Sequence, residues 1–184
     1  MSKIRCPWPK DDVQMIAYHD KEWGVPVHDD KKHFEFLVLD AFQAGLSWKT
    51  ILHRREGFRK VFADFDVVKV SKFTDKQLEK LMSDERIIRN RLKIFGTVKN
   101  AKAFIEVQRE FGSFDNYIWK FVNGKTINNK IRSMKDIRAT SPESDLMSKE
   151  LKKRGFTFVG STICYAYMQA AGLVNDHMVD CFRH

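Results

Sequence analysis

Cysteine and histidine residues lie near both ends of this 184-residue chain, in a combination that can bind a metal ion. His177 and Cys181 are four residues apart, and on a helical turn this spacing places both side chains on the same side. Cys6 and His19 lie near the other end. Together the four residues form a Cys2His2 set, which is the composition of closed, tetrahedral zinc sites.

The spacing of these residues does not establish a metal site by itself. Cys6 and His19 are too far apart to form a zinc knuckle of their own, so the set requires that the two termini lie close together. The alternative is a buried cysteine and a surface histidine at each end. Cys164, in an apolar helical segment, fits such a packing role. Three cysteines in total provide no even disulfide framework.

The charge of the chain favours a polyanionic partner. Lys and Arg number 33 against 24 Asp and Glu, which gives a net charge of +9, and excess basic charge promotes binding to phosphates. Part of this charge is ordinary solvated helix surface. The basic residues concentrate in three clusters: Arg54, Arg55, Arg59 and Lys60; Arg86, Arg89, Arg91, Lys93, Lys99 and Lys102; and Lys149, Lys152, Lys153 and Arg154.

The elements that must position these residues are helical. From Asp30 onward, Phe34, Leu37, Val38 and Ala41 follow the spacing of a helix that buries one face, and Gly45 ends it. Further helices are expected at 47–59, 74–82, 85–111, 114–122, 141–155 and 161–171. Convincing alternating strands are absent, so we predict an all-α fold.

The organisation of the chain indicates one unit spanning 1–184. It contains no internal repeat and no linker rich in proline, glycine or serine. No stretch has the length of a membrane span, and the N-terminus lacks the apolar core of a signal peptide. We expect a cytoplasmic protein with no membrane association.

Four sequence motifs, in this order, cover nearly the whole chain: AYHDKEWGVP at 17–26, QAGLSW at 43–48, KKRGFTFVGSTICY at 152–165 and GLVNDH at 172–177. They resemble the DNA-3-methyladenine glycosylase I family, bacterial enzymes of the helix-hairpin-helix superfamily. The resemblance implies a monofunctional glycosylase that hydrolyses the N-glycosidic bond of 3-methyladenine in double-stranded alkylated DNA. Such an enzyme acts in base excision repair and leaves an abasic site. We expect a monomer without an obligate protein partner.

The resemblance also implies two features of the architecture. One structural zinc ion joins the N- and C-termini, and the family's ligand pattern falls on Cys6, His19, His177 and Cys181. Two helical lobes enclose a base-binding cleft, and the helix-hairpin-helix motif lies at about 146–171.

In a helix-hairpin-helix motif, a glycine-bearing hairpin lets backbone N–H groups at the next helix N-terminus bind a DNA phosphate. The resemblance places this hairpin at Gly155 to Gly160, directly before Ser161. The run GFTFVG alone would equally fit an ordinary turn between helices. Lys153 and Arg154 immediately before it favour phosphate contact.

A base inside a duplex is unreachable, so such an enzyme rotates the nucleotide into a pocket. The pair Gly45 and Leu46 is the candidate wedge that fills the space left in the DNA helix.

Methylation at N3 makes adenine cationic, and aromatic faces attract a cation. The usual role of aromatic residues is core packing. The candidates for base stacking are Tyr18, Trp23 and Trp48, with Trp8 behind them.

Asp40 is the candidate carboxylate for recognising the base. It lies in a strongly apolar helical segment, and a buried carboxylate needs a partner. The family usually has glutamate at the matching position, so the side chain here is one methylene shorter. A second departure is Met15, where better-known members of the family have an aromatic residue. Both departures affect the geometry of the pocket.

Few residues are needed for the chemistry itself. The methyl group already makes the base a good leaving group, and the resemblance implies no catalytic lysine. Asp176 lies near the position of the general base in other helix-hairpin-helix glycosylases, but it could instead orient His177. No residue is assigned to water activation. Two other functional classes are a non-catalytic DNA-binding module and a zinc hydrolase. Four protein ligands disfavour the hydrolase, because they leave the metal no open position for water.

Overall fold

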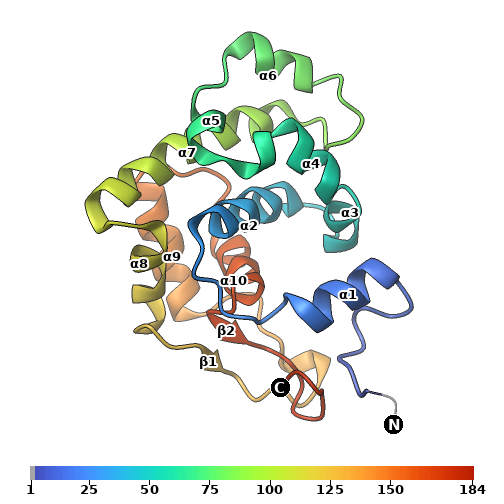
Figure 1. The fold of residues 1–184 in the computed structure, drawn as a ribbon. Helices are drawn as coiled ribbons and strands as arrows, with labels where there is room; N and C mark the ends of the chain where they lie inside the picture. The colour runs from blue at the N-terminus through green and yellow to red at the C-terminus, as the bar shows by residue number, and fades with distance from the viewer. Residues whose placement is uncertain (1–2) are drawn as a thin grey trace.

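The computed structural model describes residues 3–184 as an assembly of helices with one very short sheet (Figure 1). The first half of the chain forms α1 (Val13–Lys21), α2 (Asp30–Gln43), α3 (Trp48–Leu52), α4 (Arg55–Val61), the 3₁₀ helix η1 (Ala63–Phe65), α5 (Val67–Ser71) and α6 (Asp75–Leu81). The second half forms α7 (Arg91–Phe111), α8 (Phe114–Ile118), η2 (Trp119–Val122), β1 (Ile127–Asn128), η3 (Met134–Asp136), α9 (Pro142–Lys153), α10 (Ser161–Ala170) and β2 (Val174–Asn175). The helical architecture agrees with the predicted fold class. Among these helices, none is long and apolar enough to span a membrane.

Helix α2 forms the centre of the structure, and its ends are fixed by side chains. Asp29 caps the N-terminus by accepting a hydrogen bond from the Lys32 amide at 2.8 Å. At the C-terminus, Lys93 Nζ donates to the carbonyl oxygens of Phe42 and Ala44, at 2.8 and 2.6 Å. These bonds satisfy carbonyl groups that the end of the helix leaves without partners. The helix expected from Asp30 is therefore confirmed.

Three predicted helices differ from the structure. The segment 47–59 forms two helices, because the chain turns at Arg54, and the new direction of α4 lets Arg55 donate to both Glu22 and Glu35 at 2.8 Å. Helix α7 begins at Arg91 rather than 85, because Asn90 caps it by accepting from the Lys93 amide. In 114–122, an α-helical turn continues as a 3₁₀ helix.

Several elements were absent from the expectation. Helices α1 and α5 and the 3₁₀ helices η1 and η3 lie outside the predicted helices, and β1 and β2 form a parallel two-stranded sheet in which Ile127 pairs with Val174. Each strand has only two residues, which is too short to produce an alternating pattern.

The packing brings the two ends of the chain together below α2 and α10 (Figure 1). Helix α10 packs against both α9 and α2. The Phe182 amide donates to the carbonyl oxygen of Ile4 at 3.0 Å. The proximity of the termini that the Cys2His2 set requires is therefore present.

Candidate functional site

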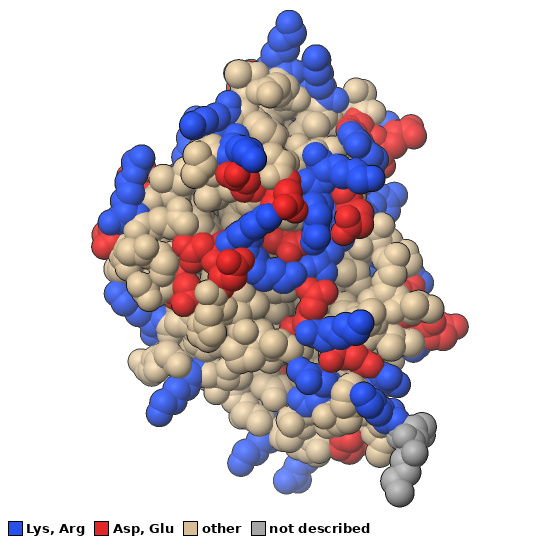
Figure 2. All heavy atoms as spheres, viewed as in Figure 1, with Lys and Arg blue, Asp and Glu red and all other residues tan. Residues whose placement is uncertain are grey.

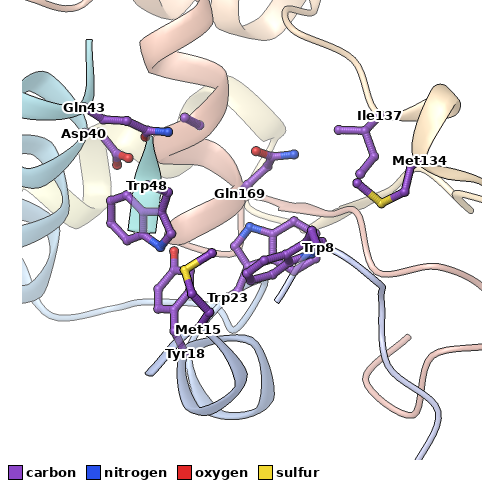
Figure 3. Close-up of a pocket in the computed structure, with 11 residues that line it drawn as sticks. Trp8, Met15, Tyr18, Trp23, Asp40, Gln43, Trp48, Met134, Ile137 and Gln169 are labelled. Atoms are coloured by element: carbon purple, nitrogen blue, oxygen red, sulfur yellow. The ribbon is translucent and has the colours of Figure 1, made fainter. Parts of the chain in front are cut away.

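A cavity of about 290 Å³ lies between α1, α2, α3, α10 and the segment around η3 (Figure 3). It brings together all six residues proposed from the sequence for base binding, although they come from separate parts of the chain. Its lining consists of Trp8, Met15, Tyr18, Trp23, Asp40, Gln43, Trp48, Met134, Ile137, Ala166 and Gln169.

Aromatic rings form much of the cavity wall. The rings of Tyr18 and Trp48 are tilted, with centres 5.0 Å apart. Trp8 and Trp23 meet edge to face at 5.1 Å, and Trp8 also contacts Tyr18 edge to face at 6.3 Å. Trp8 therefore lines the cavity directly rather than lying behind the other rings. The wall offers both ring faces and ring edges to an occupant.

Asp40 projects from α2 into this aromatic surrounding (Figure 3). Its side chain is buried, and burial raises the pKa of its carboxyl well above the ordinary value. Burial also raises the pKa of the neighbouring Tyr18 phenol, and the negative charge of Asp40 raises it further. No cation of the protein compensates Asp40, because the ion pairs found in residues 3–184 do not include it.

Three buried polar atoms of this cavity lack a hydrogen-bond partner. They are Asp40 Oδ2 and the indole Nε1 atoms of Trp8 and Trp48. A buried polar group without a partner costs on the order of 1–3 kcal/mol, and such groups are rare in folded proteins. One acceptor and two donors facing the same cavity indicate a site built to bind a polar, planar occupant.

Asp176 lies next to the cavity with its carboxylate fully engaged. It accepts hydrogen bonds from Tyr165 Oη and Gln169 Nε2, both at 2.8 Å, and from Asn129 Nδ2 at 2.6 Å. It does not contact His177, whose Nδ1 instead faces Asn175 Oδ1 at 2.9 Å. The suggested role of Asp176 in orienting His177 was therefore wrong, and the residue holds the Gln169 amide in place.

A second buried cluster joins the two ends of the chain. Ligand atoms of Cys6, His19 and Cys181 lie within 4.8 Å of one another. His19 Nε2 is 3.5 Å from Cys181 Sγ, and its Nδ1 is 2.8 Å from Asp20 Oδ1. The carboxylate oxygen is an acceptor, so Nδ1 carries the proton and Nε2 presents its lone pair to the cluster.

His177 stands beside this cluster in the same tautomeric state. Its ring centre is 4.9 Å from that of His19. Because Nδ1 donates to Asn175, the lone pair is on Nε2, which is buried without a hydrogen-bond partner. The predicted helical turn at His177 and Cys181 is wrong, since this segment forms an irregular turn after β2. That turn still places Cys181 in the cluster and His177 beside it, outside the three residues whose ligand atoms lie within 4.8 Å of one another.

The hairpin between α9 and α10 spans residues 154–160. Gly155 adopts φ +87°, a left-handed conformation that glycine tolerates best. Gly160 has an ordinary φ, and a Cβ there would meet nothing within 4 Å, so space is open before Ser161. Lys153 pairs with Glu150 at 2.7 Å, and Arg154 with Glu110 at 2.6 Å.

The loop between α2 and α3 carries the proposed wedge. Gly45 has φ +79°, and a Cβ added at this position would meet no other atom within 4 Å. The Leu46 side chain is exposed. The loop follows Gln43 and precedes Trp48, both of which line the cavity. Leu46 is therefore an unburied apolar side chain close to the cavity mouth.

The comparison with known sequences agrees with this geometry. A sequence profile described as methyladenine glycosylase matches residues 8–184. The chain belongs to this family. DNA-3-methyladenine glycosylase 1 of Escherichia coli (strain K12) is 47% identical over 177 residues, covering 96% of this chain and 95% of the relative.

Solved structures of the methyladenine glycosylase family share the whole fold. A crystal structure of 3-methyladenine DNA glycosylase I has a TM-score of 0.96 and 45% identity, covering 98% of this chain and 100% of that chain. A variant of 3-methyladenine DNA glycosylase I in complex with 3-methyladenine has a TM-score of 0.94 and 32% identity, covering 97% of this chain and 96% of that chain. The similarity extends over both the cavity and the cluster at the termini.

Several cavity residues of this methyladenine glycosylase were not predicted. Gln43 was available from the motif QAGLSW, and Gln169 lies one helical turn after Ala166 on α10, so both share one face. Met134 and Ile137 come from an irregular segment, where no periodicity could indicate them. Their position depends on tertiary contacts alone.

The predicted basic clusters are only partly available to a partner. Lys93 is buried at the end of α2, and Arg55 pairs with Glu22 and Glu35. Acidic partners also occupy Arg59 and Arg86. Figure 2 shows the same mixture on one face of the molecule, where blue and red side chains alternate. Much of the charge counted in the sequence therefore stabilises the fold.

Proposed function

We propose that this chain hydrolyses the N-glycosidic bond of 3-methyladenine in alkylated double-stranded DNA and leaves an abasic site. The observation that carries the proposal is the cavity in which Asp40 Oδ2 and two indole N–H groups lack partners among aromatic rings. The relatives and solved structures of the family that match over nearly the full chain support it.

The cavity suits a cationic base better than a neutral one. Methylation at N3 gives adenine a positive charge, and the faces of Tyr18 and Trp48 attract a cation. A carboxylate at Asp40 can accept from the exocyclic amine while it balances this charge. Ordinary adenine carries the same amine but no positive charge, so it gains neither the cation–π attraction nor the charge balance, and these two terms discriminate against the undamaged base.

Departure of the base requires little help from the protein. The C1′–N9 bond breaks as its electron pair moves onto the cationic base, which becomes neutral, and the sugar becomes an oxocarbenium-like cation. Water then adds to C1′ and releases a proton. The residues that line the cavity in the described chain include no lysine. The cavity therefore offers no amine for a Schiff-base intermediate, and the proposed reaction is direct hydrolysis by water.

Zinc is the ion that fits the cluster at the termini. A tetrahedral ion bonded at about 2.0–2.3 Å places its donor atoms roughly 3.3–3.8 Å apart, and His19 Nε2 lies 3.5 Å from Cys181 Sγ. We propose that Cys6, His19, His177 and Cys181 hold one zinc ion, which crosslinks the two ends of the chain. Asp20 orients His19, and Asn175 orients His177.

The DNA contacts follow from the hairpin and the wedge. The Ser161 end of α10 presents backbone N–H groups that favour a phosphate, and the open space at Gly160 allows a close approach. Lys153 and Arg154 supply charge nearby, partly shared with Glu150 and Glu110. Leu46 enters the duplex beside the nucleotide that leaves it.

Incubation with methylated duplex DNA, followed by chromatography of the released bases, tests the activity. The strand should stay intact until alkali cleaves the abasic site, because hydrolysis leaves the sugar–phosphate backbone whole. Cleavage of the strand without alkali would contradict the monofunctional mechanism, and absence of base release would contradict the function.

A further inference from the structure

We propose that residues 130–138 form a phosphate-binding wall at the mouth of the cavity and contact the backbone of the strand that carries the lesion. The inference rests on the proposed function and adds a DNA surface to the hairpin and the wedge. It concerns a segment that none of the predicted basic clusters includes.

Residues 130–138 lie at one edge of the cavity mouth. Met134 and Ile137 line the cavity on the side opposite Asp40, Gln43 and Trp48 (Figure 3). A nucleotide that enters the cavity base-first remains attached to its strand through both phosphates. The strand must therefore pass the mouth, where residues 130–138 form one edge and the loop of Leu46 lies toward the other.

The segment 130–138 is rich in basic residues. Lys130, Arg132, Lys135 and Arg138 are all exposed. None of them is found in an ion pair with another residue of the range 3–184, in contrast to Arg55, whose guanidinium is held by Glu22 and Glu35. Four cations without acidic partners, next to an apolar cavity mouth, are suited to contact backbone phosphates.

The one acidic residue of the segment has a structural role. Asp136 Oδ2 accepts from the Ser133 amide at 2.7 Å, from Ser133 Oγ at 3.0 Å and from the Arg132 amide at 3.2 Å. These bonds close the turn of η3, and they lower the pKa of Asp136. The carboxylate thus shapes the segment and forms no ion pair with its four cations.

The segment is held in place at its base. Ile131 is buried and forms a parallel bridge with Met178, and its carbonyl oxygen accepts from the Val179 amide at 2.8 Å. The preceding Asn129 donates to the buried Asp176. A surface ordered before DNA arrives loses less conformational entropy on binding.

The matched test compares two triple variants with the same loss of charge. Arg132→Gln, Lys135→Gln and Arg138→Gln remove three cations of the wall. Lys72→Gln, Lys76→Gln and Lys80→Gln remove three exposed cations around α6, at the opposite end of the molecule (Figure 1). Each variant binds a duplex containing a tetrahydrofuran abasic-site analogue, which offers no base to excise, over a range of salt concentrations.

The slope of log affinity against log salt should fall for the wall variant. Each lost phosphate contact reduces the magnitude of the slope by about 0.9, so a tenfold reduction in salt concentration raises the affinity roughly eightfold less than in the wild type. We expect the slope of the wall variant to fall by about 2–3, and that of the α6 variant to stay at the wild-type value. An unchanged slope in the wall variant, or an equal fall in both, would overturn the inference.

Thermal unfolding and single-turnover excision complete the test. Both variants change exposed side chains, so their melting temperatures should match that of the wild type. At enzyme concentrations below saturation, the wall variant should excise the base more slowly than the wild type, in proportion to its lost affinity, and the α6 variant should keep the wild-type rate. Wild-type protein that releases no base would instead contradict the proposed function, independently of the salt slopes.

Discussion

The Nε2 atom of His19 lies 3.5 Å from Sγ of Cys181, although 162 residues separate them in the sequence. The same cluster adjoins the aromatic cavity, because the ring of Trp23, which lines the cavity, meets the ring of His177 at 4.6 Å. Tyr18 precedes His19 on α1. The proposed metal crosslink between the ends of the chain would therefore also fix part of the wall on which a base would stack.

Zinc content and stability should depend on Cys181. The purified wild type should contain one zinc per chain. Cys181→Ser should lose most of the metal and melt at a lower temperature, because a metal that closes a long loop stabilises the folded state. Cys164→Ser is the matched control, since Cys164 is buried away from the cluster, and it should keep its zinc. Metal analysis of all three proteins checks this, and wild type without stoichiometric metal would refute the site.

Excision should depend on the carboxyl group of Asp40. Asp40→Asn keeps the size of the side chain but removes its charge and one of its acceptors. Loss of a hydrogen bond to a charged group in a buried site costs about 1.5–3 kcal/mol, which corresponds to roughly a tenfold to hundredfold loss in kcat/KM. Asp40→Glu should be milder. Unchanged excision by a folded Asp40→Asn protein would mean that stacking alone recognises the base.

The same substitution should stabilise the protein, increasingly so as the pH rises. An aspartate in the unfolded chain releases its proton near pH 4, whereas burial raises the pKa of Asp40 in the folded state. Above that pH the folded state binds more protons than the unfolded state, so the free energy of unfolding falls as the pH rises toward the folded pKa. Asp40→Asn has no carboxyl group at this position, so its free energy of unfolding does not show this decrease.

Urea unfolding at a series of pH values measures this effect. The stability of Asp40→Asn relative to the wild type should be smallest near pH 4 and should grow at higher pH. Asp11→Asn, at an exposed position, should follow the wild type throughout. A constant difference between Asp40→Asn and the wild type across the range would contradict the burial of an unpaired carboxyl.

Leu46 should matter for duplex DNA and not for the fold. Its side chain is 41% exposed, so Leu46→Ala should change the free energy of unfolding by less than about 0.5 kcal/mol. If the side chain is buried in the duplex, its loss should lower excision from duplex DNA roughly tenfold, with a smaller effect on single strands. Val68→Ala, on α5, is the exposed apolar control. Equal losses on both DNA forms would argue against a wedge.

Local signals predicted the elements that carry their own start and stop residues. The capping box of Thr74 and Gln77 is present at α6, and Ser141 caps α9 before Pro142. Helix α1 was missed although Asp12 caps it. Its inward face lacks a run of aliphatic residues, because Tyr18 faces the cavity and His19 faces the cluster with Cys6 and Cys181. The failure at α1 therefore reflects a helix whose inward residues serve a site rather than the core.

The positions of several residues depend on tertiary contacts and could not be predicted from the sequence. Lys93 counts as a surface cation by composition, yet it caps α2, and Met134 reaches the cavity only because Ile131 pairs with Met178. The family resemblance was sufficient to group Asp40 with the aromatic residues, although Asp40 lies outside the four motifs. They contained no information on the 130–138 segment, whose place is set by contacts with the C-terminal segment.

The identity of the base that the wild-type protein releases from methylated duplex DNA tests the central claim most directly. Parallel reactions with Asp40→Asn, at equal concentrations of folded protein, separate this activity from a contaminating glycosylase. The proposed function predicts free 3-methyladenine as the main product of the wild type, with at least a tenfold lower rate for the variant. Release of no base, or of an equal amount of 3-methyladenine by both proteins, would contradict it.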